Sequence, residues 1–148
     1  NSSAVKNPNL IDELANQFGS QCIVVAIDTR FDMDWKVFVN GGRKETPLFT
    51  IPWATEVQER GAGEILLTSM NHDGTKQGFA HDITKCLVEK LSIPIIASGG
   101  AGKMEHFRDV FNQTNVEAAL AASVFHFGEI KIPELKQFLK SEGVNVRI

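Results

Sequence analysis

Residues 95–107, IIASGGAGKMEHF, join an apolar run, three glycines within four positions and the start of a helix. The apolar run predicts a strand. Because glycine is the default residue where the backbone needs a positive φ angle, Gly99, Gly100 and Gly102 indicate at least a tight turn. A second interpretation is a bare backbone that an anion can approach, with the N–H groups of the following helix facing it. The segment predicts a strand–loop–helix unit, and both interpretations of its glycines stay open.

The same order of strand and helix recurs along the chain. Buried strands are expected at 22–28 (CIVVAID), 64–69 (EILLTS), 93–98 and 117–125 (EAALAASVF). Helices are expected at 9–18, closed by Gly19, and at 51–60, 82–91, 103–111 and 132–143. The alternation of Trp35, Val37 and Val39 before Asn40-Gly41 predicts a hairpin inside one long connection. Strands that alternate with helices through four units indicate an α/β fold with a parallel sheet.

Composition and charge exclude several classes to which the protein could belong. A chain of 148 residues, 43% hydrophobic and 22% charged, is long enough for one domain with a sizeable core. The net charge of −3, without a basic run, argues against nucleic acid as the main partner. No apolar run has the length of a membrane span, and nothing resembles a secretory signal. We expect a cytoplasmic protein in which Cys22 and Cys86 are reduced packing residues.

A weak internal repeat favours a barrel over an open sheet. Residues 1–19 resemble residues 121–143: each has a serine (Ser2 or Ser3, and Ser123), a short connection and an amphipathic helix that ends in glycine. Two similar sites four units apart predict the two matched halves of an eight-unit barrel, which needs about 250 residues. The chain opens with neither a methionine nor a strand before its first helix. We therefore expect residues 1–148 to form one half of a (β/α)8 TIM barrel.

Two aspartates are candidates for acid/base chemistry. Asp28 ends an unbroken apolar strand, where partial burial would make it a general acid or base; the other interpretation is a side chain that caps a helix or braces a loop. Asp73 lies in NHDGTKQG, where Asp-Gly is a common turn. Thr68 and Ser69 precede it, and Gly74 offers a backbone N–H, so a polyol or phosphate could also be held there.

The ends of the last two strands predict a phosphate site. Gly99 and Gly100 follow one strand, and Ala122 and Ser123 close the next. In barrels the corresponding loops commonly bind phosphate through backbone N–H groups. Glu64 lies at the opposite end of its strand, either as a solvated residue of the rim or as a paired charge at the lower mouth of the barrel. No metal and no cofactor are expected, because no metal-ligand spacing occurs among His72, His81, His106 and His126.

These residues resemble a known family, the cyclase subunit of imidazole glycerol phosphate synthase, from histidine biosynthesis. The matching stretches span essentially the whole chain: VVAID, GAGEILLTSMNHDGTKQG, IPIIASGGAGKMEHF, AALAASVFHFGEI and LKQFLKSEGVNVR. The resemblance implies a (β/α)8 barrel of two similar halves. It also implies that this chain is the C-terminal half, with strands five to eight and their helices, beginning at the end of the fourth strand.

The resemblance also implies a lyase reaction. Ammonia from a glutaminase subunit, docked at the lower face, would convert a bisphosphorylated phosphoribulosyl-formimino ribotide to imidazole glycerol phosphate and an aminoimidazole carboxamide ribotide. Asp28 matches one of two catalytic aspartates, the other belonging to the complementary N-terminal half-barrel. Glu64 matches a gate of the ammonia passage. The substrate- and phosphate-binding positions implied are Asp73, Gly74, Gly100, Ala122 and Ser123 at one phosphate, Thr68 and Ser98 along the site, and Asn1 and Ser2 at the other phosphate.

Departures from the family pattern keep alternatives open. Asn71 and His72 stand where the family more often has an acid and a base, and Pro47 stands where a glycine is usual. These loop differences suit a paralogue that acts on another sugar-derived substrate in surface-polysaccharide synthesis. The sister isomerase barrel, which needs no ammonia, is another candidate. An isolated half-barrel that binds phosphate but catalyses nothing is the third.

Overall fold

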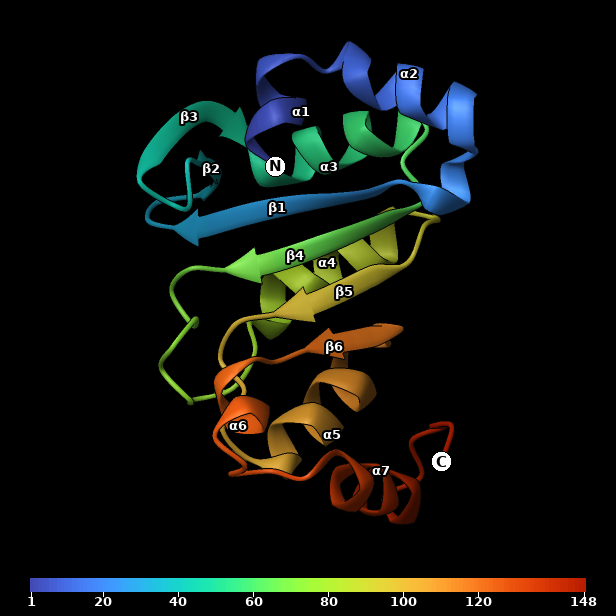
Figure 1. Ribbon diagram of the computed structural model, residues 1–148. Coiled ribbons are helices and arrows are strands. Elements are labelled where there is room, and N and C mark those ends of the chain that lie inside the picture. Colours follow the sequence, from blue (N-terminus) through green and yellow to red (C-terminus); the bar gives the residue numbers. More distant parts are fainter.

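Four parallel strands form the centre of the structure, a computed structural model that describes residues 1–148. They are β1 (Val24–Phe31), β4 (Glu64–Ser69), β5 (Ile95–Ser98) and β6 (Ala118–Leu120), and they pair in that order. Figure 1 shows their C-terminal ends on the same side of the molecule. The connections between them carry helices, as parallel pairing requires.

An antiparallel hairpin extends this sheet at β1. The strands β2 (Trp35–Val39) and β3 (Lys44–Phe49) flank a turn that begins with Asn40 and Gly41, both at positive φ. The six-stranded order is β3-β2-β1-β4-β5-β6. The alternation and the Asn-Gly pair therefore predicted the hairpin correctly.

The helices pack on one face of the central strands. Figure 1 shows α1 to α3 beyond β1, α4 behind β4 and β5, and α5 and α7 beyond β6. The strand residues turned toward them, such as Ile27, Ile65 and Leu67, are at most 1% exposed and belong to the hydrophobic core. The helices are α1 (Ser2–Lys6), α2 (Asn9–Phe18), the 3-10 turn η1 (Ser20–Cys22), α3 (Thr50–Glu59), α4 (His81–Lys90), α5 (Met104–Thr114), α6 (Ser123–His126) and α7 (Ile132–Ser141).

The other face of the parallel strands is uncovered in this chain. Alternation along the strands places Val24, Leu66 and Ile96 on it, and Leu120 extends it at the last strand. Val24 is 50% exposed and Leu120 is 43% exposed. We call this surface the open face. At the C-terminal ends of the strands the open face carries a row of three polar residues, Asp28, Thr68 and Ser98, which are neighbours in the strand register. Leu120 lies next to Ser98 and ends the row.

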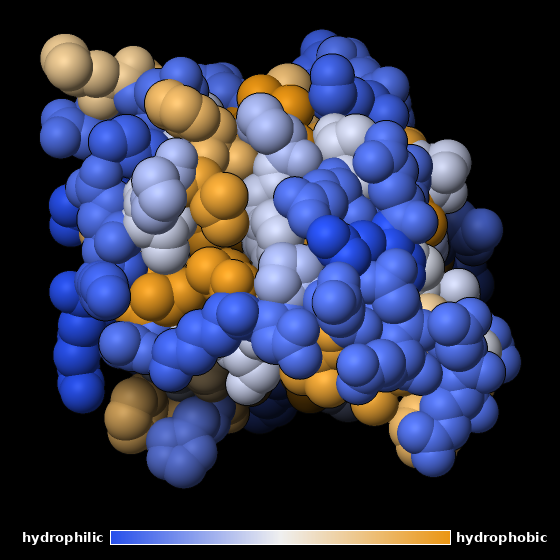
Figure 2. Space-filling view, turned by 90° about the horizontal axis from the view of Figure 1, so that it is seen from above, coloured by the Kyte–Doolittle hydropathy of each residue, from blue (hydrophilic) through white to orange (hydrophobic).

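The surface seen from the side of α1, α2 and α3 is largely hydrophilic (Figure 2). Hydrophobic residues gather on the side of this view where β2 and β3 lie in Figure 1. A groove there is lined by Val5 of α1 and by Val39, Pro47 and Leu48 of the hairpin. None of the helices combines the length and the apolar composition that a membrane span requires.

The internal repeat predicted from sequence appears as matched helical pairs. A short helix that begins with Ser2 leads through a connection into α2, and one that begins with Ser123 leads into α7. Gly19 follows α2 at φ +86, as the glycine signal predicted, and its N–H bonds the carbonyl of Ala15.

Two expectations were wrong. The strand predicted at 117–125 ends at Leu120, and Ser123–His126 is a helical turn that the N–H of His126 closes on the carbonyl of Ala122. Alanine has little preference for strands, so the local sequence does not hold this segment extended. The helical turn buries Val124 completely, and this packing in the core selects the turn over a longer strand. Cys22 is exposed on η1 and not a packing residue, although it and the partly buried Cys86 are both free thiols.

Candidate active site

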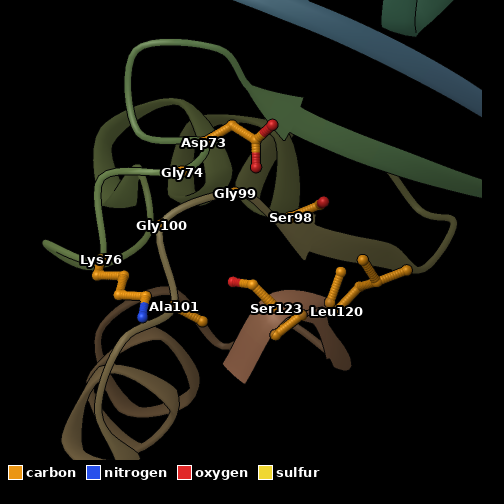
Figure 3. A pocket seen from close by; sticks show the side chains of 11 residues that line it. Asp73, Gly74, Lys76, Ser98, Gly99, Gly100, Ala101, Leu120 and Ser123 are labelled. Atoms are coloured by element: carbon orange, nitrogen blue, oxygen red, sulfur yellow. The ribbon is translucent and has the colours of Figure 1, made fainter. Parts of the chain in front are cut away.

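A cavity of about 230 Å³ lies at the C-terminal ends of β5 and β6 (Figure 3). We call it the glycine cavity. Three segments surround it: the loop after β4, the loop after β5, and the junction of β6 with α6. Its lining is Asp73, Gly74, Lys76, Ser98, Gly99, Gly100, Ala101, Leu120, Ala121, Ala122 and Ser123. This one cavity therefore brings together seven of the predicted binding residues, which are Asp73, Gly74, Ser98, Gly99, Gly100, Ala122 and Ser123.

Several polar groups of the glycine cavity have no hydrogen-bond partner within the chain. The amide N–H groups of Gly74, Gly100 and Ser123 donate no hydrogen bond to the protein. The Asp73 carboxylate and the hydroxyls of Ser98 and Ser123 also have no partner; Asp73 and Ser123 are exposed, whereas Ser98 is 8% exposed. Backbone N–H groups that converge on a hollow form a ready binding site for an anion.

At Gly100 the backbone has the positive φ that the turn interpretation predicts, whereas the anion interpretation stays a prediction. The φ of Gly100 is +108, and a Cβ there would overlap the carbonyl oxygen of Gly78, whose own N–H donates to the carbonyl of Gly100 at 2.8 Å. Gly99, at φ +91, also packs closely, since a Cβ there would lie 2.8 Å from the carbonyl oxygen of Ser69. Glycine is therefore required for the packing of two loops, and this close packing leaves the Gly100 backbone bare toward the cavity.

Asp28 lies in a neighbouring hollow of about 310 Å³, which it shares with Thr68 and Gly42. Asp73 lines both hollows, so the two are neighbours at the C-terminal edge of the sheet. The side-chain Nδ2 of Asn1 donates to Oδ2 of Asp28 at 2.7 Å and to the carbonyl of Phe38 at 2.9 Å. This contact orients the carboxylate and leaves its second oxygen without a partner in the chain. Asp28 is inside β1 and caps no helix.

The remaining predicted site residues lie at two further places. Ser2 accepts a hydrogen bond from the N–H of Asn40 at 2.9 Å, which ties α1 to the hairpin turn. Its hydroxyl and the Asn1 amide are therefore beside β1 and β2, away from the glycine cavity. Glu64 begins β4 on the open face, at the end opposite the hollows, and forms no ion pair within the chain.

Two further residues help to shape the site in ways that the sequence pattern does not predict. Lys76 lines the glycine cavity, and its backbone has a positive φ of 58°. Asn71 pairs with the backbone of Phe31 like an added strand residue: its Oδ1 accepts the N–H at 2.8 Å and its Nδ2 donates to the carbonyl at 3.0 Å. The Asn71 contact joins the loop after β4 to the end of β1, 40 residues away, so no local pattern signals it. No group of three or more metal-ligating side chains occurs.

The fold perturbs the pKa of His72, in the loop after β4. Partial burial lowers the pKa of its ring below the ordinary value of 6.5, and the nearby His81 lowers it further, while Asp82 opposes them. The ring nitrogen Nδ1 is 2.9 Å from the hydroxyl of Ser69, at the end of β4. Desolvation disfavours the protonated ring, so the folded chain holds His72 neutral.

We expect stability to fall as the pH drops below about 6.5, the unfolded pKa of histidine. In that range the unfolded state binds more protons than the folded state, so the free energy of unfolding rises with pH. The loss proceeds as the pH falls toward the lowered folded pKa of His72. Urea unfolding of His72→Gln from pH 5 to 8 should show a shallower dependence than the unaltered chain. His126→Gln is the control, since that ring is exposed; an equal slope in all three proteins would contradict the prediction.

With this geometry in place, comparison with known proteins identifies the family. Residues 1–131 match the family model described as histidine biosynthesis protein. The chain belongs to this family. The structure is a partial barrel of this family: an α/β chain whose six-stranded sheet is mostly parallel.

Curated relatives agree with this assignment. The chain is 60% identical to imidazole glycerol phosphate synthase subunit HisF of Phocaeicola vulgatus, over 100% of this chain and 59% of that protein. It is equally similar, at 60% and with the same coverage, to subunit HisF of Parabacteroides distasonis. Subunit HisF of Cytophaga hutchinsonii is 62% identical over 99% of this chain and 59% of its own length. The chain thus spans about three fifths of the length of these relatives.

Proposed function

We propose that this chain is the C-terminal half of the barrel of an imidazole glycerol phosphate synthase cyclase subunit, a cytoplasmic lyase. Its four parallel strands would be strands five to eight of a (β/α)8 barrel. Identity of 60% over the whole chain to proteins named subunit HisF supports the assignment. The matched helical pairs that begin at Ser2 and Ser123 support the division of the barrel into two similar halves.

The observation that carries the proposal is that the two hollows lie side by side and share Asp73. One end holds the free amides of Gly100 and Ser123, and the other holds the Asp28 carboxylate, with Asp73 lining both. A substrate with a phosphate at each end would anchor one phosphate in the glycine cavity. Its second phosphate would lie toward Asn1 and Ser2, so that its middle passes Asp28. Anchoring both phosphates in this way would hold the reacting atoms of the substrate close to the Asp28 carboxylate, as proton transfer requires.

In the proposed reaction, ammonia adds to the bisphosphorylated ribotide, and ring closure and cleavage follow. Asp28 moves the proton as a general acid or base, because one carboxylate oxygen stays free while Asn1 holds the other. Backbone amides hold the phosphate and do not titrate, so they bind it at any working pH. Thr68 and Ser98 offer hydroxyls along the row that lines the two hollows.

Two partners follow from the proposal. A complementary N-terminal half-barrel would cover the open face, where Val24 and Leu120 are about half exposed, and would add the second aspartate. A glutaminase subunit would dock at the N-terminal ends of the strands and supply ammonia through the barrel. Glu64 begins β4 at that end without a partner, which suits the gate of such a passage.

Turnover by the joined halves tests the proposed function. The chain is co-expressed with an N-terminal half from a subunit HisF relative, and the purified pair is supplied with the cyclase substrate and ammonium. We expect formation of imidazole glycerol phosphate that depends on ammonium. Conversion of the substrate of the sister isomerase, without ammonium, would favour that enzyme instead. A folded pair active on neither would contradict the proposed substrate and favour the polysaccharide-pathway paralogue.

A further inference from the structure

Lys76 is the only cationic side chain that lines the glycine cavity. The other lining residues are small or apolar, apart from the serines and the anionic Asp73. Figure 3 shows the Lys76 side chain extending beside Ala101 at the rim, with its ammonium group at the edge of the hollow. The amides of the cavity are neutral and the Asp73 carboxylate is negative, so this ammonium is the one positive charge that the lining offers to a phosphate.

Within the chain that charge is already engaged. The Lys76 Nζ donates to both carboxylate oxygens of Glu129, at 2.6 and 2.7 Å. Glu129 lies 53 residues further on, in the segment between α6 and α7. Both side chains are exposed, at 45% and 39%. Water screens an exposed pair of this kind, so the pair stabilises the fold little and can open at little cost.

The backbone of Lys76, by contrast, is held in place. It has a left-handed φ of 58° and packs so closely on Gly102 that a Cβ there would lie 2.5 Å from the Lys76 carbonyl oxygen. The four-carbon side chain is consequently anchored at its base and free at its tip. A lysine side chain carries a compact charge on a flexible stem, which can move between neighbouring anions.

We propose that Lys76 is a phosphate-binding residue that exchanges Glu129 for the substrate phosphate when the glycine cavity is filled. The inference rests on the proposed function, since it needs a phosphate in that cavity. A phosphate carries up to two charges against the single charge of Glu129, and it accepts charge-assisted hydrogen bonds from ammonium groups. Glu129 holds the side chain at the rim and competes with the ligand for it.

The Lys76–Glu129 ion pair could instead act only as a structural link, which we call the latch. The exchange and the latch predict opposite effects of Glu129→Gln on phosphate binding. If the ion pair only holds the loop after β4 against the segment after α6, then loss of either partner loosens the site and weakens phosphate binding. If Lys76 exchanges partners, removal of the Glu129 charge releases the ammonium group and strengthens binding. The sign of the change in Kd upon Glu129→Gln therefore separates the two.

The test is an NMR titration with inorganic phosphate, following the amides of Gly74, Gly100 and Ser123 in the 148-residue chain and in the co-expressed pair. Lys76→Met should weaken binding about tenfold or more, the size of a lost hydrogen bond to a charged group. Glu129→Gln should tighten binding a few-fold, and the double variant should bind like Lys76→Met. The matched control is Lys131→Met with Glu134→Gln, which removes an exposed ion pair of 3.0 Å outside the cavity lining and should leave Kd unchanged.

The outcomes separate this inference from the proposed function. Equal weakening by Glu129→Gln and Lys76→Met would establish the latch and overturn the exchange. Binding by the unaltered protein that Lys76→Met leaves unchanged would overturn the inference alone. If phosphate shifts none of the three amides in the unaltered protein, the phosphate cradle of the proposed function fails, and the role of Lys76 fails with it.

Discussion

Asp28→Asn is expected to reduce ammonia-dependent turnover by the joined half-barrels by about 10² to 10⁴-fold, the usual contribution of general acid–base catalysis. The substitution keeps the shape of the side chain and an oxygen that can accept the hydrogen bond from the Asn1 amide. It removes only the ability to take and return a proton. The fall should therefore be in kcat, with KM little changed, because the phosphates of the substrate bind elsewhere.

The measurement is the steady-state rate of imidazole glycerol phosphate formation by the co-expressed pair at saturating ammonium. Asp82→Asn is the matched control: Asp82 is an exposed carboxylate in the first turn of α4, outside both hollows. Its rate should stay within about twofold of the unaltered pair, as for a typical surface substitution. Retention of most of kcat in folded Asp28→Asn would show that Asp28 does not transfer the proton, and would leave it a positioning role.

Gly100→Ala is expected to lower the free energy of unfolding by about 2–4 kcal/mol, the sum of two separate costs. The residue has a φ of +108, which a Cβ strains, and that Cβ would overlap the carbonyl oxygen of Gly78. The loop after β4 would have to move away, which breaks the 2.8 Å hydrogen bond from the Gly78 N–H. Since the same backbone faces the glycine cavity, phosphate binding should be lost as well.

Gly128→Ala separates the two costs in urea unfolding experiments. Gly128 also has a positive φ, +69, but a Cβ there would meet nothing within 4 Å. Its cost should therefore be the conformational one alone, about 1–2 kcal/mol. Equal losses in the two variants would mean that the contact with Gly78 contributes nothing. Gly100 would then be required only for its backbone angle.

The pattern of the sequence predicted most of the strands and helices because their signals are local. Apolar runs such as CIVVAID and EILLTS gave strands close to their observed bounds, and Gly19 marked the end of a helix correctly. The prediction failed at 117–125, where an alanine-rich run has no strong local preference. There, burial of Val124 in the core selects a helical turn.

The sequence predicted which residues make up the candidate site, but not which of them lie next to one another. Strand-end positions pointed to Asp28, and with the glycines of the next loops they pointed to a phosphate site, because parallel strands place their C-terminal ends together. Family resemblance added Asn1 and Glu64. That Asp73 lines both hollows was not visible, since its place depends on how the loop after β4 folds back over β5.

The sequence by itself determined the α/β order and the residue types at the strand ends, because apolar patterning and glycine conformation are properties of neighbouring residues. Only the tertiary structure decided which loops meet. Contacts such as Asn1 with Asp28, across 27 residues, and Lys76 with Glu129, across 53, arise when packing of the core brings distant segments to one edge of the sheet. Such contacts leave no periodic trace in the chain, because each partner is chosen by position in space and not by separation in sequence.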